Sequence, residues 1–70
     1  MARNISITFN GLNEEVPENS TVAYLIEHFN EKDHSVIVEI NGRYIFPQTY
    51  GTTTVSEGDK LEFINPDVGG

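Results

Sequence analysis

The sequence predicts an α+β domain in which one main helix packs on one face of a mixed sheet of four or five strands. Three observations predict this class. Several short segments alternate apolar and polar residues, which is the period of a strand with one buried face. A single segment carries apolar residues at the spacing of an amphipathic helix, and Asn-Gly pairs mark two tight turns. A helix layered on a sheet buries both apolar surfaces against each other.

The first part of the chain predicts a β-hairpin. Apolar and polar residues alternate over residues 4–10 and again over residues 12–16, where Pro17 ends the pattern. The apolar positions of the first segment share one face: Ile5, Ile7 and Phe9. Asn10-Gly11 lies between the two segments and suits a type I′ turn, because both central residues of that turn need positive φ.

The next segment predicts the helix. Ser20 or Thr21 can cap its N-terminus. Its apolar positions follow the i, i+3, i+4, i+7 pattern: Val22, Leu25, Ile26 and Phe29. We therefore expect one face to be buried and the face with Glu27 and Asn30 to be exposed, with the polar residues 30–34 ending the helix.

The second half predicts three more strands. Residues 36–40 alternate, with Val36, Val38 and Ile40 on one face, and Asn41-Gly42 predicts a turn into a short strand over residues 44–46 that Pro47 ends. Residues 48–54 resemble an irregular crossing with one helical turn, and residues 57–59 a tight turn. The last strand covers residues 61–64, and we expect it to pair in parallel with the first strand at the centre of the sheet.

Length and composition exclude several classes of function. The 70 residues suffice for one small domain. Cysteine is absent, so disulfides, thiolate metal sites and a cysteine nucleophile are excluded, and His28 and His34 alone do not predict a metal site. No apolar run approaches the ~20 residues of a membrane span. A net charge of −7 argues against nucleic-acid binding. We expect a cytoplasmic protein with no nucleic-acid or membrane partner.

The chain ends in Val68-Gly69-Gly70. Two glycines leave a carboxylate on a backbone without Cβ atoms, which can pass where a side chain would clash. We expect residues 65–70 to form a flexible tail on a single domain that spans residues 1–70. Such a tail suits an enzyme that activates a C-terminal carboxylate through a narrow slot, although glycine is also common at ordinary frayed ends.

Four segments in this order, together with the diglycine end, carry a resemblance to a known family. They are Ile5-Ser6-Ile7-Thr8-Phe9-Asn10-Gly11, Ser20-Thr21-Val22-Ala23-Tyr24-Leu25-Ile26, Val36-Ile37-Val38-Glu39-Ile40-Asn41-Gly42 and Val55-Ser56-Glu57-Gly58-Asp59-Lys60-Leu61-Glu62-Phe63-Ile64. The whole chain resembles the β-grasp, ubiquitin-like sulfur carriers of the ThiS/MoaD family, and its short length is most like ThiS. Asn65-Pro66-Asp67 departs from the apolar stretch usual before the glycines of ThiS tails.

The resemblance implies a protein co-substrate rather than an enzyme, with no catalytic residues, bound cofactor or metal of its own. An E1-like adenylyltransferase of the ThiF or MoeB type would supply ATP and Mg²⁺ and adenylate the Gly70 carboxylate. Val68 and Gly69 would enter its channel with Gly70. A persulfide would then convert the adenylate to a thiocarboxylate, and a thiazole synthase of the ThiG type, or another sulfur-accepting synthase, would take the sulfur.

Three alternatives stay open from the sequence. The acceptor could be molybdopterin synthase, as for MoaD-like small subunits. The chain could be a ubiquitin-like modifier joined through Gly70 to lysines of target proteins, although it offers only Lys32 and Lys60 for chains of its own. It could also be a plain interaction module in which the two glycines have no chemistry.

Partner docking needs an exposed apolar surface beside the tail. The candidates are Ile37, Tyr44, Phe46 and Phe63. The alternative, that these side chains belong to the hydrophobic core, fits the sequence equally well.

Overall fold

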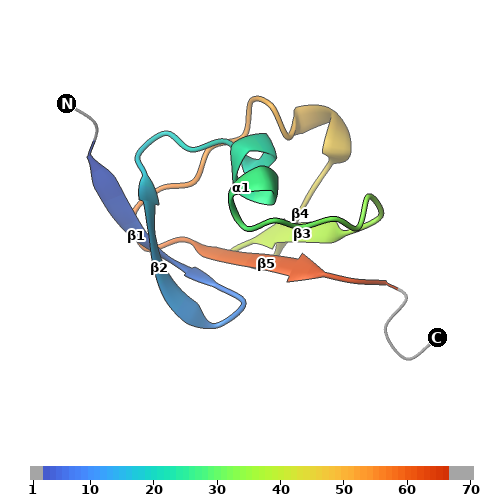
Figure 1. Cartoon of the computed structure of the whole chain (residues 1–70), viewed down its shortest axis with the longest axis horizontal. Helices are drawn as coiled ribbons and strands as arrows, with labels where there is room; N and C mark the ends of the chain where they lie inside the picture. Colours follow the sequence, from blue (N-terminus) through green and yellow to red (C-terminus); the bar gives the residue numbers. More distant parts are fainter. Residues whose placement is uncertain (1–2, 67–70) are drawn as a thin grey trace.

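The computed structural model describes residues 3–66, which form a five-stranded sheet and one α-helix. The strand order in the sheet is β2-β1-β5-β3-β4, and α1 lies across one face (Figure 1). The elements are β1 (Asn4–Phe9), β2 (Leu12–Pro17), α1 (Val22–His28), β3 (Ile37–Ile40), β4 (Arg43–Ile45), the 3₁₀ turn η1 (Pro47–Thr49) and β5 (Lys60–Ile64). The predicted fold class and order of elements are confirmed.

Both Asn-Gly pairs form the hairpin turns that the sequence predicts. In the β1–β2 turn Asn10 has φ 50° and Gly11 has φ 86°, and in the β3–β4 turn Asn41 has φ 54° and Gly42 has φ 80°. Positive φ at both central residues defines the type I′ geometry, which matches the twist of the flanking strands. The turns therefore fix the register of both hairpins.

Helix α1 begins with a side-chain cap. The Thr21 hydroxyl oxygen accepts a hydrogen bond from the backbone N–H of Tyr24 at 3.0 Å, so Thr21 is the cap and Ser20 is not. The Ser20 hydroxyl instead donates to the carbonyl of Pro17. Val22 and Leu25 are fully buried on the face that packs against the sheet.

The first and last strands pair in parallel, as predicted. The register joins Thr8 with Lys60 and Phe9 with Leu61, and the N–H of Asn10 donates to the Leu61 carbonyl at 3.0 Å. On its other side β5 pairs antiparallel with β3. The last strand is therefore the central strand of the sheet.

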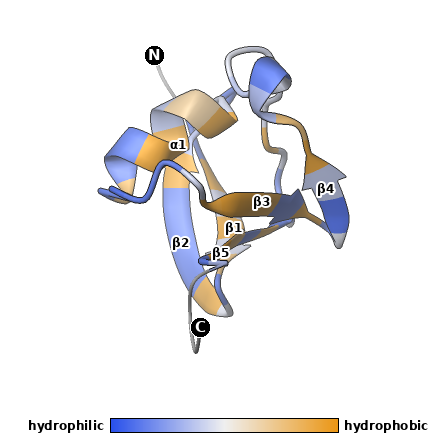
Figure 2. Cartoon of the chain, turned by 90° about the vertical axis from the view of Figure 1, so that its right-hand side faces the viewer, coloured by the Kyte–Doolittle hydropathy of each residue, from blue (hydrophilic) through white to orange (hydrophobic). Residues whose placement is uncertain are grey.

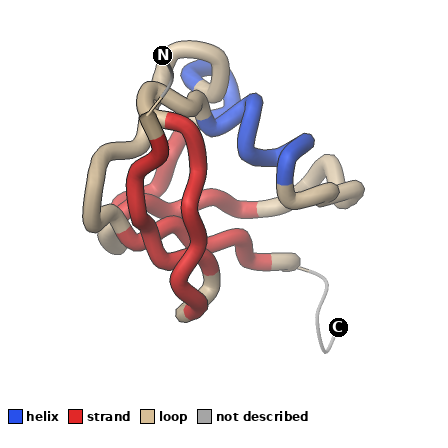
Figure 3. Tube along the Cα trace, turned by 60° about the vertical axis from the view of Figure 1, so that its left-hand side comes forward, coloured by secondary structure: helices blue, strands red, loops and turns tan. Residues whose placement is uncertain are grey.

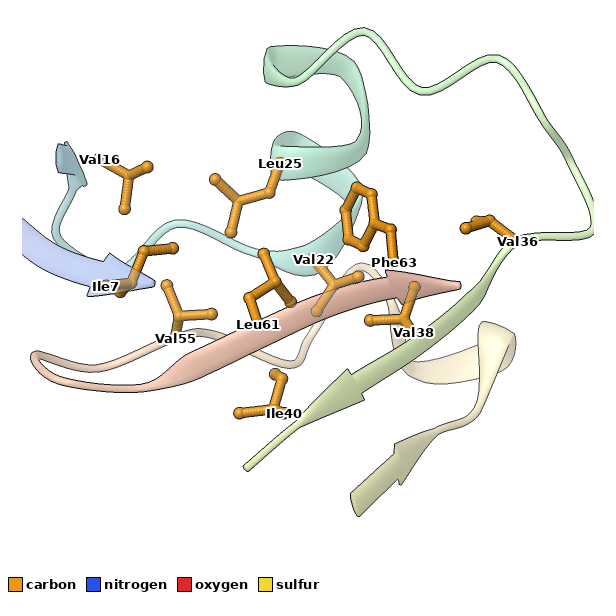
Figure 4. Close-up of a cluster of buried hydrophobic side chains, with 10 residues drawn as sticks. All are labelled: Ile7, Val16, Val22, Leu25, Val36, Val38, Ile40, Val55, Leu61 and Phe63. Carbon is orange, nitrogen blue, oxygen red and sulfur yellow. The ribbon is translucent and has the colours of Figure 1, made fainter. Parts of the chain in front are cut away.

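The hydrophobic core fills the space between α1 and the sheet (Figure 4). Its ten buried residues come from all parts of the chain: Ile7, Val16, Val22, Leu25, Val36, Val38, Ile40, Val55, Leu61 and Phe63. Apolar colour accordingly gathers on β3, β5 and the parts of α1 near them (Figure 2). The helix lies on one side of the strands and leaves the other side of the sheet uncovered (Figure 3), and we call this side the outer face.

Candidate docking surface and tail root

The strand registers decide which side chains share the outer face. Ile37 pairs with Ile64 and Glu39 with Glu62 between β3 and β5, and Glu39 pairs with Tyr44 between β3 and β4. Directly paired residues of antiparallel strands point to the same side of a sheet. Because Val38 and Leu61 point into the core, these five side chains point away from it.

Four apolar side chains gather on this face close to the end of β5, and together we call them the outer patch: Ile37, Tyr44, Phe46 and Ile64. Tyr44 is 49% exposed, Phe46 61% and Ile64 41%. The rings of Tyr44 and Phe46 meet edge to face with centroids 5.0 Å apart. Extending the β3–β4 register by one residue places Phe46 opposite Ile37. An exposed apolar group of this kind is typical of a protein interaction site.

Two glutamates lie beside the outer patch. Glu39 and Glu62 are direct cross-strand partners, one row further along the sheet from Ile37 and Ile64. Like charges directly opposite each other destabilise a sheet. The outer face therefore carries paired negative charge next to its apolar side chains.

Phe63 does not belong to the docking surface, and for this residue the core alternative is correct. Its side chain is only 6% exposed. The alternation of β5 places Phe63 on the same side as Leu61, where its ring meets Phe9 edge to face at 4.9 Å. Phe9 in turn stacks on Phe29 of the helix end at 4.0 Å. These three rings close the core at the end of α1.

The sequence interpretation missed Ile64 as a surface residue. It grouped Ile64 with Leu61 and Phe63 as apolar residues of the last strand. The signal was present, because Leu61 and Phe63 are two residues apart and face inward, which turns Ile64 outward. Ile64 replaces Phe63 in the candidate surface.

A hydrogen bond ties the chain that leaves β5 to the loop between α1 and β3. The Asn65 side-chain amide donates to the Asp33 carboxylate at 2.8 Å. The other oxygen of Asp33 accepts from the backbone N–H of Ser35 at 2.9 Å and from its hydroxyl at 2.7 Å. The bond from Asn65, followed by the two from Ser35, holds the pKa of Asp33 below its ordinary value of 3.8, because all three stabilise the charged carboxylate.

The predicted reactive end lies outside the described residues. Val68, Gly69 and Gly70, together with Asp67, follow the last described residue, Pro66. The described residues extend two positions past β5, to Pro66, and the first of them, Asn65, makes a side-chain hydrogen bond. The sequence predicts a flexible tail over residues 65–70, and residues 67–70 of it lie outside the described residues. We call residues 66–70 the tail and Asn65 its root.

Residues 3–66 lack two features, a cluster of metal-ligating side chains and a membrane-spanning helix. In this part of the chain, no group of three or more His, Cys, Asp or Glu side chains is placed so that it could hold a metal ion. Within the same residues, no helix has the length and apolar character needed to cross a membrane.

Comparison with known proteins gives two findings. A model described as the ThiS family matches residues 2–70. The crystal structure of the thiamine biosynthesis protein ThiS from Geobacter metallireducens is similar to this chain, with 30% sequence identity and a TM-score of 0.79. The similarity covers 86% of this chain and 91% of the Geobacter protein. No curated protein sequence gave a significant match.

Proposed function

Because the chain belongs to the ThiS family, we propose that it is a sulfur carrier for thiamin biosynthesis and that its reactive group is the Gly70 carboxylate. The observation that carries the proposal is the family match over residues 2–70, which includes the glycines. The β-grasp sheet adds support, because it leads its central strand directly to the tail. The chain itself would be a co-substrate and not a catalyst.

The proposed chemistry has three steps. A carboxylate oxygen of Gly70 attacks the α-phosphate of ATP on the partner enzyme, and pyrophosphate leaves. The outer sulfur of a persulfide then attacks the acyl carbon, and AMP leaves as a far better leaving group than oxide. Cleavage of the resulting acyl disulfide by a thiol leaves the thiocarboxylate. ATP, Mg²⁺ and the acid–base groups would all belong to the E1-like enzyme, of the ThiF or MoeB type.

The carrier would contribute reach and a docking surface. Five residues follow Asn65, up to and including Gly70, and an extended chain of that length spans at most about 18 Å. The activating enzyme must therefore bind close to the tail root to bring the carboxylate to its nucleotide. The outer patch lies at this end of β5, which makes it our proposed contact for that enzyme.

Pyrophosphate exchange with the cognate E1-like enzyme tests the reactive group. The intact chain should support ATP–pyrophosphate exchange, and deletion of Gly70 should abolish exchange without changing the melting temperature. Deletion withdraws the carboxylate by roughly 3.3–3.6 Å. Exchange at the normal rate by the shortened chain would exclude the Gly70 carboxylate, and a joint loss of exchange and thermal stability would give the tail a structural role.

A second experiment tests the sulfur acceptor. The family match favours thiazole formation over the molybdopterin route. The thiocarboxylate form, recognised by the intact-mass gain from replacing one oxygen by sulfur, should lose sulfur to a ThiG-type thiazole synthase. Transfer to the large subunit of molybdopterin synthase alone would assign the chain to the alternative acceptor. Attachment to target lysines would assign it to the modifiers.

A further inference from the structure

We propose that Asp33 and Asn65 form a latch that fixes the point and direction from which the tail leaves the domain, so that both are positioning residues for activation of the C-terminus. The inference rests on the proposed function only for its kinetic readout. Its structural readout concerns the domain alone.

The latch joins two segments that are far apart in the chain. Asn65 directly follows β5, and Asp33 lies in the loop between α1 and β3, 32 residues earlier. The end of β5 and the start of β3 lie at the same end of the sheet (Figure 1), where Ile37 pairs with Ile64. The ladder between β3 and β5 ends at this pair. The bond from Asn65 to Asp33 therefore continues the attachment of the chain beyond the sheet.

The acceptor side of the latch is braced. Ser35 donates two hydrogen bonds to one Asp33 oxygen, at 2.9 Å from its N–H and 2.7 Å from its hydroxyl, which leaves the other oxygen for Asn65. The N–H of Asp33 donates to the Glu31 carboxylate at 2.9 Å, and its carbonyl accepts from Val36 N–H at 3.2 Å. Ser35 thus orients the Asp33 carboxylate, and the bonds to Glu31 and from Val36 hold the backbone of Asp33.

The donor side is also restricted. Pro66 follows Asn65 and disfavours helical backbone at Asn65. A bond from a neutral amide to a charged carboxylate is stronger than one between two neutral groups. A latch of this kind anchors the root without adding a charge to the segment that enters the partner.

An anchored root lowers the ordering cost of binding. A chain that starts from a fixed point has fewer conformations to lose when it enters a narrow channel, which improves binding without a new contact. Loss of the latch should therefore weaken productive binding and leave the chemical step unchanged once the carboxylate is in place.

Five variants, one of which combines the two alanine changes, separate the latch from ordinary structural effects. Asn65→Ala and Asp33→Ala each remove it. Asn13→Ala is the matched control, because it truncates an exposed asparagine on β2 that takes no part in the bonds around Asp33 and Asn65. The double variant Asp33→Asn with Asn65→Asp reverses donor and acceptor, since an amide at 33 can still accept from Ser35 and can donate to a carboxylate at 65.

The first readout is the ¹⁵N heteronuclear NOE of the Ile64 and Asn65 amides in the isolated domain. Asn65→Ala and Asp33→Ala should lower it, while Asn13→Ala and the reversed pair should keep the value of the unmodified chain. The second readout is pyrophosphate exchange. Asn65→Ala and Asp33→Ala should each raise the KM for the carrier about three- to tenfold, with kcat changed less than about twofold. The double alanine variant should raise the KM no further than either single variant. The reversed pair should restore the KM of the unmodified chain.

The outcomes distinguish failure of the latch from failure of the proposed function. An unmodified chain that gives no exchange refutes the proposed function, and the NOE comparison still decides on the latch. If the unmodified chain supports exchange but the alanine variants leave both the NOE and the KM unchanged, the latch is refuted. Additive effects of the two alanine changes, or no rescue by the reversed pair, would show that the residues act separately and would also refute it.

Discussion

Asparagine recurs in the connections of this domain where the backbone is left-handed. Within residues 3–66, four residues other than glycine have positive φ, and all four are asparagines: Asn10, Asn19, Asn30 and Asn41. Left-handed backbone costs most L-residues roughly 1–2 kcal/mol, and asparagine tolerates it best after glycine because its short polar side chain can bond locally. Each of these asparagines lies in a connection between elements, including both hairpin turns.

Two of these side chains also bind across the sheet. The Asn10 side-chain oxygen accepts from the N–H of Phe63 at 2.9 Å, and the Asn41 oxygen accepts from the N–H of Lys60 at 2.9 Å. The Asn41 amide donates to Asp59 at 3.0 Å. Both turns are thereby tied to β5 or to the residue before it. An asparagine whose positive φ suits the turn thus also helps, through its side chain, to hold the central strand.

At the same scale, Leu25→Ala should strongly destabilise the domain. Leu25 is fully buried between α1 and the sheet. Truncation of a core leucine costs about 2–5 kcal/mol, a large part of the 5–15 kcal/mol typical of whole domains. Denaturant unfolding followed by circular dichroism measures the change. Glu27→Ala, on the exposed side of the same helix, should stay within about 0.5 kcal/mol. Equal effects of the two changes would mean that the helix face is misassigned.

At the scale of the elements, local patterns were sufficient to predict all five strands, the helix and both hairpin turns. They were sufficient because apolar residues alternate in β1, β2, β3 and β5, while β4 falls in a short apolar run that Pro47 ends. Each hairpin also has its own Asn-Gly pair. The sequence offered Phe63 as a docking residue, whereas its side chain points into the core. An apolar residue in a strand can face either side of the sheet until the register of the strand is known. The bond between Asp33 and Asn65 has no local signal, since only the completed sheet brings the two residues together.

The N-terminus of α1 provides a test at this scale. Thr21→Ala removes the hydroxyl that accepts from the Tyr24 N–H, and should cost about 1 kcal/mol of unfolding free energy. Thr21→Ser keeps that oxygen and should recover most of the loss. Chemical denaturation of the three proteins gives the comparison. A serine variant as unstable as the alanine variant would instead assign the effect to the threonine methyl group or to the bridge between Thr21 and Thr54.

At the scale of the whole molecule, the sheet has two faces with different roles. One face holds the core under α1, and the outer face carries the outer patch beside the tail root. On the proposed function, alternate residues of the same strands would serve stability on one face and docking on the other. The pair Ile37–Ile64 and the buried pair Val38–Phe63 are neighbours in the same ladder and point to opposite sides.

A substitution in the outer patch should therefore weaken partner binding and leave the stability of the domain unchanged. Phe46→Ala should weaken binding to the E1-like enzyme by about 1 kcal/mol or more, because its ring is 61% exposed in the outer patch, edge to face with the Tyr44 ring. Its melting temperature should change little. Leu12→Ala is the matched control, since Leu12 is 66% exposed at the β1–β2 turn, away from the outer patch. Calorimetric titration that finds equal affinities for both variants would exclude this docking surface.

The central place of β5 has a consequence for the synthesis of the protein. The chain is made from its N-terminus, yet its last strand lies between β1 and β3 and supplies two of the ten core side chains, Leu61 and Phe63. In a nascent chain that stops before β5, neither β1 nor β3 has the strand that pairs with it at the centre of the sheet. The residues that follow β5 are made only after the strand that completes the sheet. Any chain long enough to carry the two glycines therefore also carries β5, so on the proposed function a chain whose synthesis stopped before β5 would lack the reactive end as well as the central strand.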